Sequence, residues 1–178
     1  MLLPYKEGSV LMTSPYGMRG DSMHYGVDLV GTDKNITAVY GGKVTRSQFD
    51  DSWGNYVAVE SGDGSTRYYC HLSERLKSAG EKVIAGDVIG IEGSTGNSTG
   101  SHLHYEVRRG NEKLNAADDV MIPNVIGNYP ADNVTHYIES LGAICEYSPG
   151  TVQLMKEFNH PFRYDYWRKL FNAVNNRV

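Results

Sequence analysis

One stretch of this 178-residue chain decides both its fold and its chemistry: Gly100-Ser101-His102-Leu103-His104-Tyr105-Glu106-Val107. The pattern predicts a β-strand, in which side chains alternate between two faces. His102 and His104 therefore project from one face, and Leu103 and Tyr105 from the other. Two imidazoles on one face can bind one ion, although such a pair is more often only the polar face of a strand.

Two further histidine motifs make a metal site the better interpretation. The first is His24-Tyr25-Gly26-Val27-Asp28, and the second is Tyr68-Tyr69-Cys70-His71-Leu72. His24 and Asp28 are an even number of residues apart, so both face one side of a strand unless a bulge intervenes. Histidines together with an acid suit Zn²⁺, whose catalytic sites combine three protein ligands with a water.

The composition sets the class of protein. The chain has 20 glycines, 13 tyrosines and six prolines, which favours a β-rich fold with many tight turns. Its length corresponds to one domain, or to one domain with an appendage. With 17 basic and 21 acidic residues the net charge is −4, and no basic cluster appears. Nucleic acid is therefore not an expected partner.

The two cysteines, Cys70 and Cys145, are too few for a disulfide framework, and we expect buried free thiols. The neighbouring Cys70 and His71 raise the alternative of a Cys–His nucleophile. Because neighbours in a strand point to opposite faces, Cys70 is expected to face away from the site.

Local patterns predict most of the secondary structure. Strands are expected over residues 22–30 (broken at Gly26), 43–49, 56–60 and 66–71, with the last two joined as a hairpin through Asp63-Gly64. Two shorter strands are expected around the Gly86-Asp87 turn, and a helical turn over 73–78. Residues 93–101 are expected to form a flexible rim beside the site, and residues 114–129 an irregular segment that closes over the sheet.

Eight motifs occur in one order along the chain, and together they resemble the M23 family of zinc metallopeptidases, the lysostaphin and LytM group. They are Ser14-Pro15-Tyr16-Gly17-Met18-Arg19, His24-Tyr25-Gly26-Val27-Asp28, Gly41-Gly42-Lys43-Val44, Gly54-Asn55-Tyr56-Val57, Tyr69-Cys70-His71-Leu72, Val83-Ile84-Ala85-Gly86-Asp87-Val88-Ile89-Gly90, Gly93-Ser94-Thr95-Gly96-Asn97-Ser98-Thr99-Gly100 and His102-Leu103-His104-Tyr105-Glu106-Val107. The resemblance implies a mainly β fold, an antiparallel β-sheet with a groove, as a peptidase domain over residues 1–129. It also implies endopeptidase cleavage of bacterial peptidoglycan.

The resemblance further implies the roles of five residues. The zinc ligands are His24, Asp28 and His104, and the catalytic residues that act on the water and the substrate are His71 and His102. Zinc would polarise the scissile carbonyl and lower the pKa of its bound water, while neutral imidazoles accept a proton or stabilise the oxyanion. The division of tasks between the two catalytic histidines stays open.

The turn before the first ligand bears on specificity. Glycine-bridge cleavers of the family have an aromatic residue there, whereas this turn is short and carries Met18, Arg19 and Asp21. The resemblance therefore favours a D-amino-acid bond, in a stem peptide or a direct crosslink, over pentaglycine.

The alternative is a protein without catalytic activity, either a phage tail component or a cell-division regulator on the same fold. Members of the family that have lost ligands act as activators of other wall enzymes, and zinc sites can also be purely structural. A closed structural site normally uses four ligands rich in thiolate, whereas three nitrogen and oxygen ligands leave one position open. All five positions are filled here, which favours catalysis. His136 and His160 have no partner motif, so we expect surface or cap residues.

Residues 130–178 show three apolar stripes at helical spacing and predict a helical appendage. Such stripes are usually packing surfaces; the functional alternative is a wall-targeting or oligomerising module, or a contact with a phage virion. Residues 124–129 resemble a junction, so a chain ending near Asn128 is expected to stay soluble and active on small peptides.

The start of the chain bears on where the protein acts. Met1-Leu2-Leu3-Pro4 lacks a cationic region, so no signal peptide is expected, and no transmembrane segment is expected either. This favours a phage-borne lysin that acts at the cell wall. A secreted bacterial enzyme excised from its leader is the runner-up.

Overall fold

The computed structural model describes residues 3–6, 8–120 and 125–130. The chain divides into two units, Met1–Ala131 and Asp132–Val178, and all described residues belong to the first. The helices predicted beyond residue 130, together with His136, Cys145 and His160, lie outside the described residues, so the appendage and the domain boundary remain predictions.

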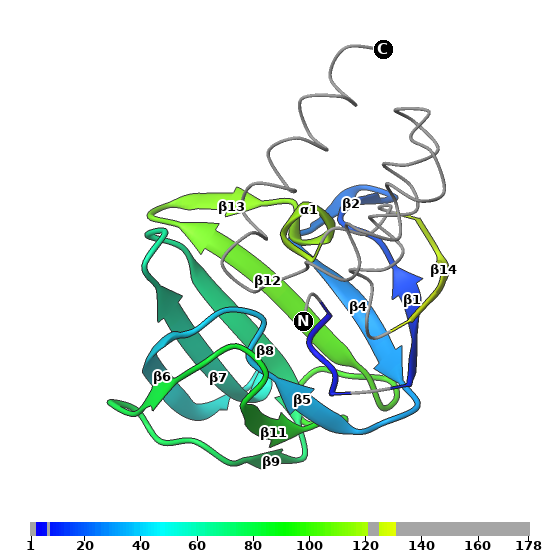
Figure 1. The fold of residues 1–178 in the computed structure, drawn as a ribbon. Helices are drawn as coiled ribbons and strands as arrows, with labels where there is room; N and C mark the ends of the chain where they lie inside the picture. Colours follow the sequence, from blue (N-terminus) through cyan, green and yellow to red (C-terminus); the bar gives the residue numbers. More distant parts are fainter. Residues whose placement is uncertain (1–2, 7, 121–124, 131–178) are drawn as a thin grey trace, which may run out of the picture. The chain divides into compact units, whose positions relative to one another are not determined.

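A large antiparallel sheet organises the described part of the chain (Figure 1). Its strands lie in the order β10-β6-β7-β8-β12-β4-β1-β14, and β13 adds to β12. The bounds are β10 Lys82–Val83, β6 Gly42–Asp50, β7 Gly54–Ser61, β8 Thr66–Leu72, β12 Leu103–Arg109, β4 Gly26–Gly31, β1 Ser9–Ser14, β14 Gly127–Pro130 and β13 Glu112–Leu114. Both the antiparallel sheet and the predicted β class are confirmed.

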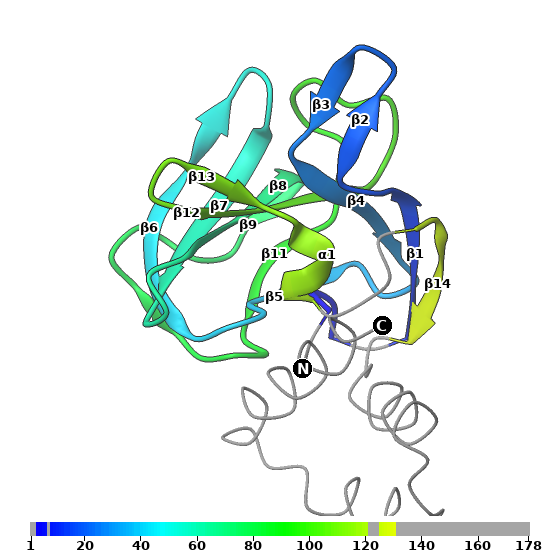
Figure 2. The ribbon, with the colours of Figure 1, turned by 90° about the horizontal axis from the view of Figure 1, so that it is seen from above.

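Two smaller sheets complete the described fold. One has the order β5-β11-β9, with β5 Asn35–Thr37, β11 Val88–Ile91 and β9 Glu74–Arg75. The other is the hairpin of β2 (Gly17–Arg19) and β3 (Ser22–His24). Figure 2 shows this hairpin beside the loop that joins β11 to β12. The short helix α1 (Ala116–Asp119) follows β13, and Asn115 caps it by accepting a hydrogen bond from the Ala117 N–H.

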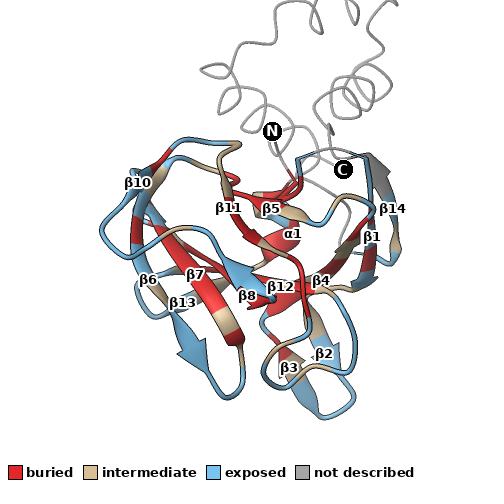
Figure 3. Ribbon diagram, turned by 90° about the horizontal axis from the view of Figure 1, so that it is seen from below, coloured by how far each residue is buried: buried red, intermediate tan, exposed pale blue. Residues whose placement is uncertain are grey.

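The two faces of the central strands bury different material. Along β12, Leu103, Tyr105 and Val107 enter the main apolar core, which also holds Val27 and Leu29 of β4. Figure 3 shows how the buried residues gather in β4, β12 and the elements next to them. The residues between these, His104 and Glu106 among them, occupy the opposite face. Strict alternation in β12 therefore separates the core from the polar face, as the sequence predicts.

Several local predictions meet a mixed outcome. The hairpin through Asp63-Gly64 is confirmed, since the N–H of Ser61 donates to Ser65 O at 3.0 Å at the β7–β8 turn. The helical turn over 73–78 is wrong, because Glu74–Arg75 pair with β11 as strand β9. The strands around Gly86-Asp87 exist, but β10 joins the large sheet and β11 the small one. In both cases, pairing with strands distant in the sequence determined the structure, and the local pattern did not.

The segment predicted to be irregular, residues 114–129, is more ordered than expected. It contains the end of β13, the helix α1 and the start of β14, and β14 pairs with β1 through Leu11↔Asn128 and Met12↔Gly127. The supposed junction is thus a strand of the sheet. The local sequence hid this because Gly127 and Pro130 resemble loop residues, while the pairing partner lies more than a hundred residues away.

Candidate metal centre

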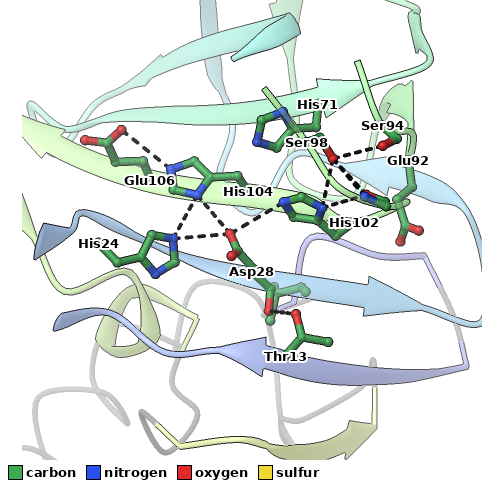
Figure 4. A network of polar contacts seen from close by, with 12 residues as sticks. Thr13, His24, Asp28, His71, Glu92, Ser94, Ser98, His102, His104 and Glu106 are labelled. Carbon is green, nitrogen blue, oxygen red and sulfur yellow. Dashed lines mark hydrogen bonds and ion pairs between the residues drawn. The ribbon is translucent and has the colours of Figure 1, made fainter. Parts of the chain in front are cut away.

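The three predicted metal ligands converge from three neighbouring strands (Figure 4). His24 ends β3, Asp28 lies in β4, and His104 lies in β12 directly opposite Asp28 in the sheet register. Opposed residues in an antiparallel pair share a face, so the pairing brings these two side chains together. His24 reaches them because Tyr25 interrupts the extended chain and β3 turns into β4.

The distances between the three ligand atoms are close to the edge length of a single coordination tetrahedron. His24 Nε2 is 3.0 Å from His104 Nδ1 and 3.2 Å from Asp28 Oδ1, and His104 Nδ1 is 2.9 Å from Asp28 Oδ1. Tetrahedral zinc with bonds of about 2.0–2.1 Å places its ligand atoms about 3.3 Å apart. The three donors are therefore spaced for one small cation.

The hydrogen bonds on the far sides of the rings support this arrangement. His24 Nδ1 lies 2.8 Å from Pro15 O, which can only accept, so Nδ1 carries the proton and Nε2 presents its lone pair. His104 Nε2 faces the carboxylate of Glu106 at 3.9 Å. A carboxylate or carbonyl behind a metal-bound imidazole is the usual means of orienting it. Two imidazole nitrogens and one carboxylate oxygen are a donor set that fits Zn²⁺.

Two of the three predicted ligands, Asp28 and His104, have pKa values shifted toward their charged forms. Burial alone would raise the pKa of Asp28, but hydrogen bonds and positive charge from His104 and His24 hold that pKa far below its ordinary range. Burial would lower the pKa of His104, yet the carboxylates of Asp28 and Glu106 raise it. The imidazoles and the carboxylates thus favour each other's charged forms, Asp28 as the anion and His104 as the cation.

Gly26 makes room for the His104 ring. A Cβ on Gly26 would stand 2.7 Å from Cε1 of His104 and 2.5 Å from Tyr105 O, closer than any real contact. The sequence suggested that Gly26 breaks the strand, but Gly26 lies within β4 and the interruption falls at Tyr25. A glycine is required here because the imidazole lies directly over the backbone.

His71 and His102 lie beside the three ligands without joining them. Their ring centroids are 4.7 Å apart. Nδ1 of His71 donates to Thr95 O at 2.8 Å, and Nδ1 of His102 donates to Gly100 O at 2.8 Å. Each ring therefore carries its proton on Nδ1 and leaves the lone pair of Nε2 available, with Nε2 of His102 lying 3.8 Å from Asp28 Oδ1 (Figure 4). Burial lowers the pKa of His71, which favours its neutral form.

His71 reaches this position through a β-bulge. Cys70 and His71 both lie opposite the single residue Tyr56, and His71 has a φ of +62°, uncommon for a residue other than glycine. The register pairs Cys70 with His104, so Cys70 lies on the same face as the site. The expectation that Cys70 faces away is wrong, because the bulge breaks the alternation between neighbours.

Cys70 nevertheless takes no part in the site. It is a free thiol, fully buried in a small cluster with Tyr56, Ala58 and Tyr68. Burial, with a contribution from Glu106, raises its pKa well above the ordinary value. A thiol that stays protonated is a poor nucleophile, so the Cys–His alternative fails on burial rather than on direction.

A pocket of about 310 Å³ opens over the histidines. Its lining combines the five predicted site residues with six others: Arg19, Ser52, Trp53, Asn97, Ser98 and Thr99. Residues 97–99 belong to the loop that the sequence placed beside the site. Arg19, Trp53 and Glu106 were not predicted as site residues; their only sequence signal was their position inside or next to the motifs.

The loop over residues 93–101 is anchored rather than free at its first half. Thr95 Oγ1 donates to Leu72 O at 2.7 Å and accepts from the Asn55 N–H at 2.9 Å. Gly54 and Gly96 approach so closely that a Cβ on Gly96 would meet Gly54 N at 2.2 Å. These contacts hold Thr95 O where it accepts from His71.

A buried carboxylate holds the other end of the loop. Glu92 Oε1 accepts from Ser101 Oγ at 2.7 Å and from Lys34 Nζ at 2.6 Å. Its Oε2 accepts from the Gly31 N–H at 2.9 Å, at the end of the strand that carries Asp28. Glu92 thus ties the residue before His102 to strand β4.

Together, an antiparallel sheet, a convergent His/Asp/His set and an open pocket define a candidate metallohydrolase centre. This chain belongs to peptidase family M23, whose model matches residues 22–116. The LytM-like fold predicted from the motifs agrees with that membership.

Similar proteins span several activities. The glycyl-glycine endopeptidase ALE-1 of Staphylococcus capitis is 37% identical over 122 residues, covering 66% of this chain and 33% of that protein. The peptidoglycan DD-endopeptidase ShyC of Vibrio cholerae is 40% identical over 84 residues, covering 47% of this chain and 19% of that protein. The chain thus spans about a third or less of the length of these curated relatives.

A solved structure gives the same fold. The mutant catalytic domain of the prophage-encoded M23 protein EnpA from Enterococcus faecalis matches with a TM-score of 0.58 and 32% identity. The match covers 64% of this chain and 94% of that domain. In the described part of this chain, no helix has the length and apolar character needed to cross a membrane.

Proposed function

We propose that this chain is a zinc-dependent endopeptidase that hydrolyses peptide bonds in bacterial peptidoglycan. The observation that carries the proposal is the convergence of His24 Nε2, His104 Nδ1 and Asp28 Oδ1 beneath an open pocket. Three protein donors leave a position for water or substrate, which is the arrangement of catalytic rather than structural zinc sites.

A zinc ion held by these residues would supply Lewis acidity and a water of lowered pKa. The chain's own contribution is a pair of oriented bases. Nε2 of His71 and Nε2 of His102 are the available acceptors of two rings whose Nδ1 atoms are tied to backbone carbonyls. One ring can take the proton of the attacking water on Nε2, and the resulting Nε2–H can then be donated to the leaving nitrogen; the second ring can stabilise the developing oxyanion when its Nε2 is protonated and donates a hydrogen bond.

For the substrate, we propose a D-amino-acid bond in a stem peptide or a direct crosslink. The relatives include a glycyl-glycine endopeptidase and a DD-endopeptidase, so their names favour neither bond. The proposal therefore rests on the residues around the pocket. In the β2–β3 hairpin this chain carries Met18, Arg19 and Asp21 and no aromatic residue. A cationic rather than aromatic rim suits an anionic peptide better than an uncharged glycine run.

The non-catalytic alternative predicts a different site. A regulator or tail component of this fold has no need of a complete ligand set or of two oriented bases, yet all five residues are present and face one pocket. The likeness to a prophage-encoded enzyme supports a phage-borne lysin acting at the bacterial wall. A secreted bacterial enzyme acts on the same substrate.

The test is zinc content together with turnover of purified sacculi by the full chain. We expect about one zinc per chain and release of soluble fragments, and both should be lost in His104→Ala. His136→Ala, which removes a histidine outside the motifs, is the matched control and should retain both. A zinc-loaded, folded protein that releases nothing from sacculi or from small peptides would support the regulatory alternative.

A further inference from the structure

Arg19 lines the pocket but has no role in the proposed hydrolysis. Arg19 ends β2, and its guanidinium lines the pocket beside the ligand cluster. Nη2 donates to Asp28 Oδ2 and lies 3.0 Å from His24 Nε2. Its side chain is 44% exposed, so the group stands at the boundary between the cluster and the open space.

Arg19 uses only part of its hydrogen-bonding capacity. Among the residues that the structure describes, Nη1 and Nε of Arg19 have no hydrogen-bond partner, whereas a guanidinium offers five donors in a planar fork. Arg67 and Arg108 differ, since each uses two or more nitrogens on carboxylates. Arg19 is thus a partly committed cation at the edge of a pocket.

The geometry at Asp28 lets Arg19 keep its hydrogen bond to Oδ2 when a metal binds, while the contact between Nη2 and His24 Nε2 is given up to the metal. Oδ1 of Asp28 faces the two histidines, and Oδ2 faces Arg19. A cation held by Oδ1 and the imidazoles therefore leaves the bond between Oδ2 and the guanidinium available. Apart from Arg19, Asp28 and the histidines, the pocket-lining side chains are uncharged, so Arg19 is the permanent positive charge that a substrate meets there.

We propose that Arg19 selects substrates that carry a free carboxylate next to the scissile bond. This rests on the proposed peptidase function and names its substrate class. A guanidinium binds a carboxylate through two parallel charge-assisted hydrogen bonds. A crosslink in which the residue on the leaving-amine side keeps its α-carboxylate presents that group, whereas both sides of a glycine–glycine bond continue as neutral amides.

The experiment compares two soluble peptides that differ at one group, a D-alanyl-D-amino-acid free acid and its carboxamide. For the zinc-loaded full chain we expect kcat/KM to favour the acid by roughly 10- to 100-fold. Arg19→Gln should bring the ratio close to one with the zinc content unchanged. Arg19→Lys, which keeps the charge but loses the fork, should retain part of the preference. Arg46→Gln, an exposed arginine on β6, is the matched control.

Two outcomes overturn the proposal. An unchanged acid-to-amide ratio in Arg19→Gln would mean that another group, the metal included, binds the carboxylate. Loss of zinc from Arg19→Gln would assign Arg19 to the metal site instead. If the wild-type chain cleaves neither peptide, the proposed function fails separately. Calorimetric binding of the same two peptides then tests Arg19 through the same ratio.

Discussion

Two charged clusters lie on opposite faces of strand β12, and they differ in how completely they are paired. On the core face, the fully buried Arg67 donates to Asp119 at 2.7 and 3.0 Å and to Asp63 at 2.9 and 3.3 Å. Tyr105 adds a bond to Asp119 at 2.5 Å. On the other face, His104, next to Tyr105 in sequence, joins His24 and Asp28 around one point.

The two clusters differ in whether their hydrogen-bonding groups are already satisfied by one another. Around Arg67 the donors match the acceptors, and the guanidinium also lies 3.8 Å over the Tyr40 ring. Such a cluster is complete without a ligand. Around His104 the acceptors converge without an equal number of donors, and the cluster opens into a pocket. Both clusters are buried and charged, but only the cluster around His104 has lone pairs that can bind a ligand.

The largest effects are expected at the two bases on the open face. His71→Ala and His102→Ala should each retain zinc and fold but lose roughly 10²- to 10⁴-fold in rate, because each removes an oriented proton acceptor. Metal analysis and peptide kinetics on the same samples measure both quantities. A variant that loses its zinc while remaining folded would show that its histidine is a ligand, and the comparison would need redrawing.

A substitution in the Arg67 cluster should lower the stability of the fold rather than the catalytic rate. Arg67→Ala leaves two carboxylates and a tyrosine hydroxyl without their buried cation, and we expect a loss of about 3–5 kcal/mol in the free energy of unfolding. Below the melting transition the variant should still bind zinc. Denaturant unfolding with zinc titration checks this, and Arg46→Ala on the surface should change stability by less than about 0.5 kcal/mol. A selective loss of zinc without loss of stability would contradict the assignment.

A smaller change in stability is expected when the pH is lowered, because the Arg67 cluster contains the titratable carboxylate of Asp63. Burial alone would raise the pKa of Asp63, but hydrogen bonds from Arg67 and the Ser65 N–H, together with the positive charge of Arg67, outweigh it and lower the pKa to about 2. Because the folded pKa lies below the unfolded one, the stabilisation is present above about pH 4 and is lost as the pH falls toward about 2. Asp63 is partly exposed, so screening reduces the contribution to about 1 kcal/mol.

Asp63→Asn tests this linkage. The difference in unfolding free energy between wild type and variant should be constant above about pH 4 and shrink toward zero near pH 2. Measurements in the presence of a chelator remove the contribution of metal release. A difference that does not change with pH would mean that the Asp63 charge is not what stabilises the fold.

The smallest effect is expected from removal of the tail. A chain ending after Ala131 keeps β14 and its pairing with β1, so it should stay soluble and cleave a small peptide at nearly the full rate, with any loss confined to intact walls. A chain ending at Asn128 cuts through β14 and should be the less stable of the two. An insoluble or unfolded chain ending at Ala131, beside a stable full-length protein, would reject a separable tail.

The resemblance of eight motifs to family M23 predicted the family, the antiparallel β class and the five residues that line one pocket. For His102 and His104 the reason is local, because side chains alternate along a strand and residues two apart share a face; His24 and Asp28 lie on two strands, β3 and β4, and meet because the chain turns at Tyr25. The Asp63-Gly64 hairpin was also predictable from local sequence, since its turn type depends on two adjacent residues.

Tertiary pairing decided the rest. The bulge at His71 depends on the register between β7 and β8, and it placed Cys70 on the site's face against the alternation rule. Strand β14 exists because β1 offers it a free edge, and Glu92 reaches Ser101, Lys34 and Gly31 only after three segments have come together. Arg19 became a site residue in the same way, because the β2–β3 hairpin folds its guanidinium against Asp28. Contacts between distant segments depend on register and hairpin direction, which no short stretch of sequence encodes.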